Sequence, residues 1–456
     1  GQPGVVPLNQ STDSTVPPPS SSQNLTGIAL SEIESDPSGT GSESIIDNPA
    51  GEPIGIGGVD ELVSLEALAL GNNATLRRMR MEAGAAWAKT GYVSKLPDPS
   101  ISSMVFAPPM TFEPDRQVAE LQVTQMIPWL GRLKAEGRQA CFEAMAAQTD
   151  YEAERLRVVG DLRANWYRLY VIRRQIETVT AEKTQLESLI QTANAQVRTG
   201  NAQPGDVLMA TLELSSLQEQ FLSFQQQERS TSAEINRLLG RDPSTTLTPM
   251  DALTTELPPW TMDSIRDTAR AHQPELNAAR LRTAAARWGI EVARLRRRPD
   301  LTFGVGWVAM DAPGSTMPGA GRDSLTVAMS ATIPIWHGKY DAMVSEASRQ
   351  HRAAHASEDE IEQRLDAMLV DLWQQALAAN ETIKLYQLSI LPQARQTLEA
   401  NQNSLGNGAV SFDRVIRDYR TFINLQLGYE RAVGQLATAL ARLRQTTGKD
   451  FISGSD

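Results

Sequence analysis

Two histidines in the second half of the chain come closest to a site for chemistry. His351 and His355 lie one helical turn apart with Glu358 close behind, a spacing that can place metal ligands on one face of a helix. The other histidines, His272 and His337, fall in different predicted elements and do not complete a ligand set. An exposed polar helix face explains the pair, so we predict no metal site.

The sequence also lacks the motifs of known catalytic sites. It has no glycine-rich phosphate loop after a strand, no Gly-x-Ser-x-Gly turn and no cysteine cluster. Its single cysteine, Cys141, lies among alanine and methionine residues of a predicted helix, which indicates a packed side chain. We therefore predict no enzyme activity, no catalytic residues and no cofactor.

Four methionines lie near the predicted strands and their loops, namely Met104, Met110, Met310 and Met317. A thioether path for copper or silver could be built from them, but methionine is also a common filler of loops and membrane-facing surfaces. The substrate therefore stays open at this stage.

Glycine-containing turns occupy corresponding places in the two halves of the chain. Glycine ends a long predicted helix at each turn, and Pro204 or Ser411 starts the returning helix. The turns are thus predicted tips of helix hairpins, and a tip at the end of a long hairpin can dock a partner protein. The residues assigned to docking are Arg198, Thr199, Gly200, Gly406, Gly408 and Ser411.

A mixed set of acids and bases follows the second tip, namely Asp413, Arg414, Arg417 and Asp418. Three copies of such a set at a narrow axis can select ions, or hold a gate shut through pairs between subunits. Ordinary solvated pairs on one helix surface are the alternative.

Very long helices lead to these tips. One runs from Gly131 to about Thr199, and the other runs from Gly338 to Leu405 with Pro392 as its only proline. Each would be on the order of 100 Å long at about 1.5 Å per residue. Apolar residues recur three and four positions apart, which predicts seams of a coiled coil between neighbouring helices. These residues are Leu162, Trp166, Leu169 and Ile172 in the first helix and Leu365, Leu369, Leu372 and Ala376 in the second.

Each half also carries two stretches that alternate between apolar and small polar residues. We place strands at about 100–107 and 117–125 in the first half, and at about 301–310 and 324–333 in the second. From Leu301 to Trp307, for example, every second residue is apolar and the residues between are threonine or glycine. About ten residues suffice to cross a bilayer at a tilt.

Two hairpins at equivalent positions favour a membrane-spanning sheet over hairpins lying on a soluble helical domain. Their predicted outer faces are apolar, and their inner faces carry Ser, Thr, Gly and Gln. A spanning sheet must close, and a barrel needs roughly eight strands or more. Four strands per chain are too few, so several chains must share one barrel. Twelve strands from three chains are one closed solution.

The two halves of the chain are repeats of one unit, at an offset of about 200 to 208 residues. One pair of corresponding segments is Ile127-Pro128-Trp129-Leu130-Gly131-Arg132 in the first half and Ile333-Pro334-Ile335-Trp336-His337-Gly338-Lys339 in the second. We divide the chain into a disordered Ser/Pro/Gly-rich leader at 1–58, a first repeat at 59–240 with its tip near 200–206, a linker at 241–262, a second repeat at 263–450 with its tip near 406–414, and a tail at 451–456.

Composition narrows the range of partners. The net charge of −11 over 456 residues comes without a basic patch interleaved with aromatic residues, so we expect no nucleic-acid binding.

In this order of helix, strand pair, long helix, glycine tip and returning helix, given twice, the chain resembles the TolC family of outer-membrane efflux proteins. The Ile-Pro elements are similar to the link that joins strand to helix in that family, and the resemblance covers about residues 60–450. Ile333 to Tyr340, with Leu391 to Ala394, resembles the metal-efflux branch typified by CusC and CzcC.

The resemblance implies a mixed α+β membrane protein: a homotrimer with a twelve-stranded β-barrel in the outer membrane and a coiled-coil tube of helices across the periplasm. It implies passive export of a substrate delivered by a periplasmic adaptor and an inner-membrane efflux transporter, and contact with outer-membrane lipid. The linker at 241–262 would belong to an equatorial belt around the tube.

The first tip fits the family pattern, because Asp206 stands six residues after Gly200. The resemblance therefore adds Asp206 to the predicted gate residues. The second departs from it, since Arg414 stands six residues after Gly408. Where relatives carry rings of aspartates, this chain has the mixed set. Two alternatives remain open at this stage, an exit duct for type I protein secretion and a non-conducting coiled-coil protein of the envelope.

Overall fold

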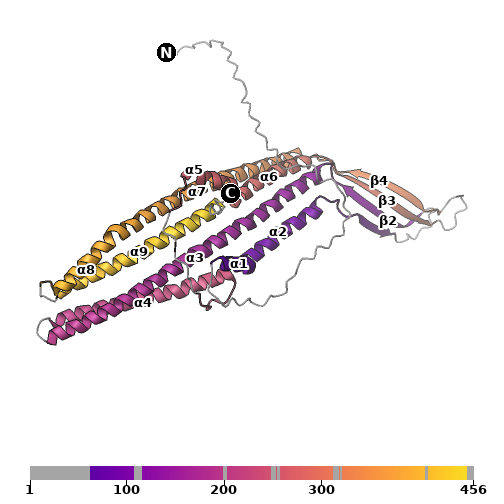
Figure 1. Ribbon diagram of the computed structural model, residues 1–456. Helices are drawn as coiled ribbons and strands as arrows, with labels where there is room; N and C mark the ends of the chain where they lie inside the picture. The colour runs from indigo at the N-terminus through magenta and orange to yellow at the C-terminus, as the bar shows by residue number, and fades with distance from the viewer. Residues whose placement is uncertain are drawn as a thin grey trace, which may run out of the picture. The chain divides into compact units, whose positions relative to one another are not determined.

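The computed structural model describes residues 62–106, 116–198, 203–247, 253, 257–311, 318, 321–405 and 409–448. The predicted leader at 1–58, the tail at 451–456 and the tip residues Thr199, Gly200, Gly406 and Gly408 lie outside these ranges. The helices are α1 (Leu62–Asn72), α2 (Ala74–Val93), α3 (Arg132–Arg198), α4 (Pro204–Leu239), α5 (Met262–His272), α6 (Pro274–Leu295), α7 (His337–Leu385), the π-helix η1 (Tyr386–Ile390), α8 (Leu391–Leu405) and α9 (Phe412–Thr447) (Figure 1). The strands are β1 (Ser100–Val105), β2 (Arg116–Ile127), β3 (Leu301–Asp311) and β4 (Ser324–Ala331).

The long helices pack through the apolar seams that the sequence predicts. Leu162, Trp166 and Leu169 of α3 are almost fully buried. They pack in one apolar cluster with residues of α1 and of the end of α4. Toward the tips, α3, α4, α8 and α9 share one apolar cluster that includes Leu186, Leu217 and Tyr419. The described ends of the two hairpins are therefore held together by apolar packing.

The long helical run that leads to the second tip, from α7 to α8, contains one turn that is not α-helical. Between α7 and α8 the chain makes one π turn, in which the Leu391 N–H donates to the carbonyl of Tyr386, five residues earlier. Pro392 follows at once, and because it has no N–H it cannot extend the α-helical ladder in the ordinary way. The predicted interruption at Pro392 is thus a widened turn within a continuous helical run.

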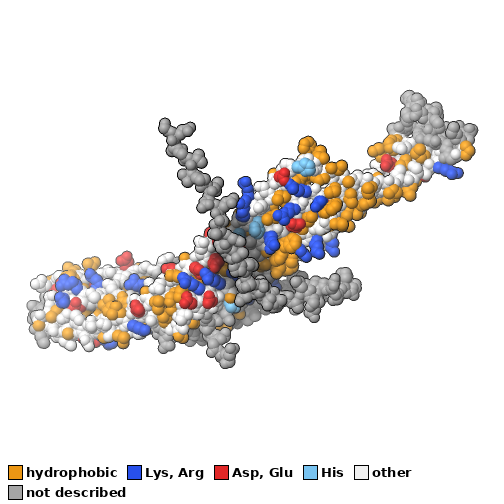
Figure 2. Space-filling model, turned by 90° about the horizontal axis from the view of Figure 1, so that it is seen from above, with side chains coloured by type: hydrophobic (Ala, Val, Ile, Leu, Met, Phe, Trp, Pro, Cys, Tyr) orange, Lys and Arg blue, Asp and Glu red, His pale blue; other side chains and the backbone are white. Residues whose placement is uncertain are grey.

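The sheet is a four-stranded antiparallel meander in the order β1-β2-β3-β4. Its register lines up Ile101, Val123, Val305 and Val327 in one row, and Ser102, Gln122, Gly306 and Thr326 in the next. Successive rows face opposite sides, so one face is apolar and the other polar, as the alternation predicts. The large apolar side chains of the first face are exposed and appear orange along the strands in Figure 2.

A glycine ends the returning helix of each repeat in the same way. Gly240 ends α4 with φ +67°, and Gly448 ends α9 with φ +74°. A Cβ atom on Gly240 would lie 2.7 Å from the Asn72 carbonyl oxygen, and one on Gly448 would lie 2.7 Å from that of His272. Each returning helix therefore ends against the turn that joins the first two helices of its own repeat.

In the described part of the chain, no helix is both long enough and apolar enough to cross a membrane.

Candidate functional site

The junction from β2 to α3 is fixed by one carboxylate from the other repeat. The Asp300 carboxylate accepts hydrogen bonds from the Trp129 backbone N–H at 3.0 Å and from the Arg132 guanidinium at 2.9 and 2.8 Å. Gly131 between them has φ +89°, a conformation that favours glycine. The Ile-Pro link thus turns sharply from strand to helix and is tied to the start of β3.

The matching junction of the second repeat is more open. The Thr332 N–H bonds to the backbone carbonyl of Asp300 at 2.9 Å, while Ile333, Ile335 and Trp336 are each more than 60% exposed. The first repeat has Ser100 in place of Asp300, so this junction has no equivalent carboxylate. Sequence reasoning missed Asp300, although its place beside Pro299 at the start of a strand was a usable signal.

Four of the five charged residues predicted for the gate, those after the second tip, pair along α9 within one chain. Arg417 forms an ion pair with Asp413, and Arg414 lies 3.4 Å from Asp418. Asp418 also accepts a bond of 2.5 Å from the Asn401 amide of α8. Both arginines are more than half exposed, so each pair is weak and can be exchanged for another partner.

Asp206 has a local structural role at the first tip. Its carboxylate accepts a hydrogen bond of 3.0 Å from the Gln203 backbone N–H and closes a capping box at the start of α4. Ser411 is the N-cap residue of α9 but makes no side-chain cap bond, and Arg198 is the last residue of α3. The structure brings Asp413, Arg414, Arg417 and Asp418 together, whereas Asp206 belongs to the other hairpin.

A polar link joins the two hairpins above the tips. Tyr419 of α9 donates to the backbone carbonyl of Glu182 of α3, and Arg420 forms an ion pair with Glu213 of α4. Burial raises the pKa of the Glu182 carboxyl, and the nearby Tyr419 hydroxyl opposes this rise. Burial, followed by interaction with Glu182, raises the pKa of Tyr419 as well. One Glu182 carboxylate oxygen is buried without a hydrogen-bond partner among the described residues.

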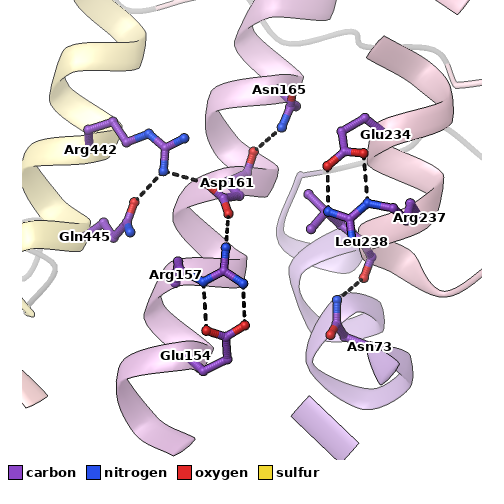
Figure 3. Close-up of polar contacts among 10 residues, drawn as sticks. All are labelled: Asn73, Glu154, Arg157, Asp161, Asn165, Glu234, Arg237, Leu238, Arg442 and Gln445. Carbon is purple, nitrogen blue, oxygen red and sulfur yellow. Dashed lines mark hydrogen bonds and ion pairs between the residues drawn. The ribbon is translucent and has the colours of Figure 1, made fainter. Parts of the chain in front are cut away.

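A second network links the middle of α3 to the last turns of α9 (Figure 3). The Asp161 carboxylate accepts bonds from Arg442 of α9 at 2.6 Å and from Arg157 of its own helix at 3.0 Å. In the same view the buried Asn73 side chain donates to the Leu238 carbonyl at 2.9 Å. Asn73 also accepts hydrogen bonds from the backbone N–H groups of Thr75 and Leu76 at the start of α2. Neighbouring helices are thus tied by single polar side chains as well as by apolar seams.

The histidines and the cysteine stay apart from these networks. His355 bonds to Asp359 of its own helix at 3.2 Å, and Cys141 is half-buried in α3. Within the described ranges no three His, Cys, Asp or Glu side chains are grouped as a metal ion would need.

Each repeat thus contributes one long helix hairpin and two strands of a single amphipathic meander. A family model described as "Outer membrane efflux protein" matches residues 66–241 and 265–449. The chain belongs to that family, so it is the outer-membrane channel component of an efflux system, with its helices in the periplasm.

Solved structures of such channels have the same fold. OprN is 17% identical with a TM-score of 0.74, over 85% of this chain and 90% of that one. CusC is 17% identical with a TM-score of 0.73, over 86% and 93% of the two chains. VceC from Vibrio cholerae is 17% identical with a TM-score of 0.72, over 86% and 96%. A search of curated proteins finds no significant match.

Proposed function

We propose that three copies of this chain close one twelve-stranded barrel and one helical tube, and that this duct passively exports a solute delivered by a periplasmic adaptor and an inner-membrane transporter. The duct itself carries out no enzymatic reaction. Membership of an efflux family favours this function over a protein-secretion duct or a non-conducting envelope protein.

The open edges of the sheet are the observation that carries the proposal. β1 and β4 each pair on one side only, and every residue of both strands is exposed in the single chain. Unpaired backbone groups cannot remain in lipid, where each costs several kcal/mol. Because the meander alternates in direction, β4 of one chain can pair antiparallel with β1 of the next.

The ends of the helices supply a second surface for the same contact between copies. Leu208 and Leu212 of α4 are 70% and 69% exposed, and Leu388 of the π turn is 81% exposed. Exposed leucines on the first hairpin and on the second fit a head-to-tail interface, in which two different surfaces meet and a ring closes.

Disulfide trapping tests this arrangement. In a Cys141→Ala background, Ser102→Cys, Ser100→Cys or Met104→Cys in β1 is combined with Thr326→Cys in β4. A head-to-tail ring gives linked dimers and trimers only when both cysteines are present, and each single-cysteine variant is the matched control. Linked dimers from the single-cysteine variants, or no product from any pair, would refute the shared barrel.

We also propose that the hairpin tips dock the adaptor and that the charges on α9 form the periplasmic constriction. The pairing within α9 supports a resting state in which the charges are neutralised, and adaptor contact can exchange the partners because the arginines are exposed. The tip residues Thr199, Gly200, Gly406 and Gly408 belong to this proposal on the ground of sequence alone.

The metal-efflux branch stays a prediction. The likeness to CusC is about as strong as those to OprN and VceC, and at 17% identity each shows the fold alone.

A further inference from the structure

A groove of about 740 Å³ runs along one face of the helices above the tips. Helices α3 and α9 form its floor, and side chains of α4 and α7 line its sides. Gly434 allows the two floor helices to approach closely, since a Cβ atom there would collide with Val171. The volume is in the range that holds a drug-sized molecule.

The groove lies on the uncovered side of the helix layer. On α9, Leu436 and Leu440 belong to an apolar cluster against which Leu257 and Trp260, from the link between the repeats, pack. At about 100° per residue, Arg431 and Gly434 project from the opposite side of that helix. On α3, likewise, α1 packs on a face that carries Leu162 and Trp166, not on the groove face. The described residues of α1 and of the link between the repeats pack on other faces of the two helices.

The charge of the groove is positive. Arg168 lines it, is exposed and has no hydrogen bond or ion pair to any described residue, and Arg431 bonds only to the Leu427 carbonyl, at 3.2 Å. Arg442 is neutralised by Asp161. Among the described residues that line the groove, none is acidic. Two guanidinium groups are thus uncompensated in a chain of net charge −11.

The rest of the lining suits a ligand that is partly apolar. Val171, Ile172 and Leu427 form a buried apolar floor. Amide side chains rise around it, including Asn424 and the 95% buried Gln175, neither of which bonds to a described residue. Amides and guanidinium groups donate to carboxylate or sulfonate oxygens.

We propose that this groove is a transit site for an organic anion with an apolar body, and that it faces the lumen of the assembled duct. The proposal rests on the proposed function, and it names a class of substrate for that duct. Three chains would place six uncompensated guanidinium groups at one level of the tube. The positive field of these groups, concentrated inside the tube, would attract anions.

Matched dyes test the binding. The full chain, in nanodiscs of phosphatidylcholine, is titrated with 8-anilinonaphthalene-1-sulfonate and with N-phenyl-1-naphthylamine, which has the same rings without the sulfonate; empty nanodiscs give the blank. We expect the sulfonate to bind at least about tenfold more tightly than the amine. The Arg168→Gln/Arg431→Gln variant should lose about tenfold in sulfonate affinity and none in amine affinity, and Asn424→Arg should bind the sulfonate more tightly.

The control variant is Arg349→Gln/Arg352→Gln, which removes the same charge from exposed residues of α7 outside the groove. Equal sulfonate affinity in the wild type and the groove variant, or an equal loss in the control, would overturn the site. Circular dichroism and mass by light scattering confirm that each variant folds and assembles.

Reversal potentials in a KCl gradient across a planar bilayer test whether the groove faces the lumen. The groove variant should shift selectivity toward cations, and an unshifted potential would place the groove outside the lumen. The two failures are distinguishable: a wild-type protein that never conducts or is not trimeric contradicts the proposed function, whereas a conducting trimer without selective sulfonate binding contradicts only the groove.

Discussion

Replacement of Asp300 by alanine tests whether one carboxylate holds the strand-to-helix junction of the first repeat. The change removes the acceptor of the Trp129 N–H and both hydrogen bonds of Arg132 to the Asp300 carboxylate. Among the described residues, Arg132 then keeps only its ion pair with Glu136, at 3.9 Å. Breaking a fully buried ion pair costs about 3 to 5 kcal/mol. Arg132 and Asp300 retain 15% and 19% exposure, so we expect a smaller cost of about 2 to 4 kcal/mol.

Hydrogen exchange measures this cost at the site itself. Because about 1.4 kcal/mol is tenfold in an equilibrium, amides around Trp129 should exchange about 30- to 700-fold faster in Asp300→Ala. Asp300→Asn keeps an acceptor for Trp129 but loses the charge, so its effect should be intermediate.

The exposed pair of Arg78 and Glu82 provides the control. Its side chains are 60% and 58% exposed, and Glu82→Gln should leave exchange near Trp129 unchanged. If exchange at residues 127–135 in Asp300→Ala matches the wild type, the carboxylate does not hold the junction and our interpretation of the Ile-Pro link is wrong.

Three further changes probe other parts of the molecule. Gly448→Ala should lower the free energy of unfolding by about 1 to 3 kcal/mol, because Gly448 has a positive φ and a Cβ atom there would collide with the His272 carbonyl. Gly205→Ala, at a helical position with open space around it, should not lower the free energy of unfolding, and equal effects of the two changes would contradict the cap. Arg414→Gln/Arg417→Gln should raise resting single-channel conductance, and unchanged conductance would discard the gate. Glu182→Gln should be more stable than wild type near neutral pH, since a raised folded-state pKa gives stability that is lost as pH rises; the gap should close on acidification, and a gap that widens would refute the sign.

Local patterns were sufficient to predict the fold. The alternation along β3 and β4 and the three- and four-residue spacing in α3 appear in the structure as an amphipathic sheet and a buried seam. Both depend on neighbours in sequence, which the chain's periodicity records. The split of the first helical stretch into α1 and α2 at Asn73 was missed, although asparagine is a common N-cap residue.

The candidate site was less predictable because its contacts are distant in sequence. Asp300 meets Trp129 and Arg132 about 170 residues away, and Tyr419 meets Glu182 at a separation of 237. No local pattern specifies such pairs. The pairing of Asp413 with Arg417 could have been read from their four-residue spacing, which places them on one helix face. The roles of the tip residues remain proposals.

The lengths of the two repeats also show where the chain tolerates a difference. Gly338 lies 207 residues after Gly131, and Leu405, the last residue of α8, lies 207 residues after Arg198, the last residue of α3. Gly448 lies 208 residues after Gly240, and the returning helices α4 and α9 have 36 residues each. The two repeats therefore differ by one residue in the segments 199–203 and 406–411 that join the long helices to the returning ones. The helical limbs have kept equal lengths, although only the second contains a π turn, so the caps at Gly240 and Gly448 close both repeats in the same way.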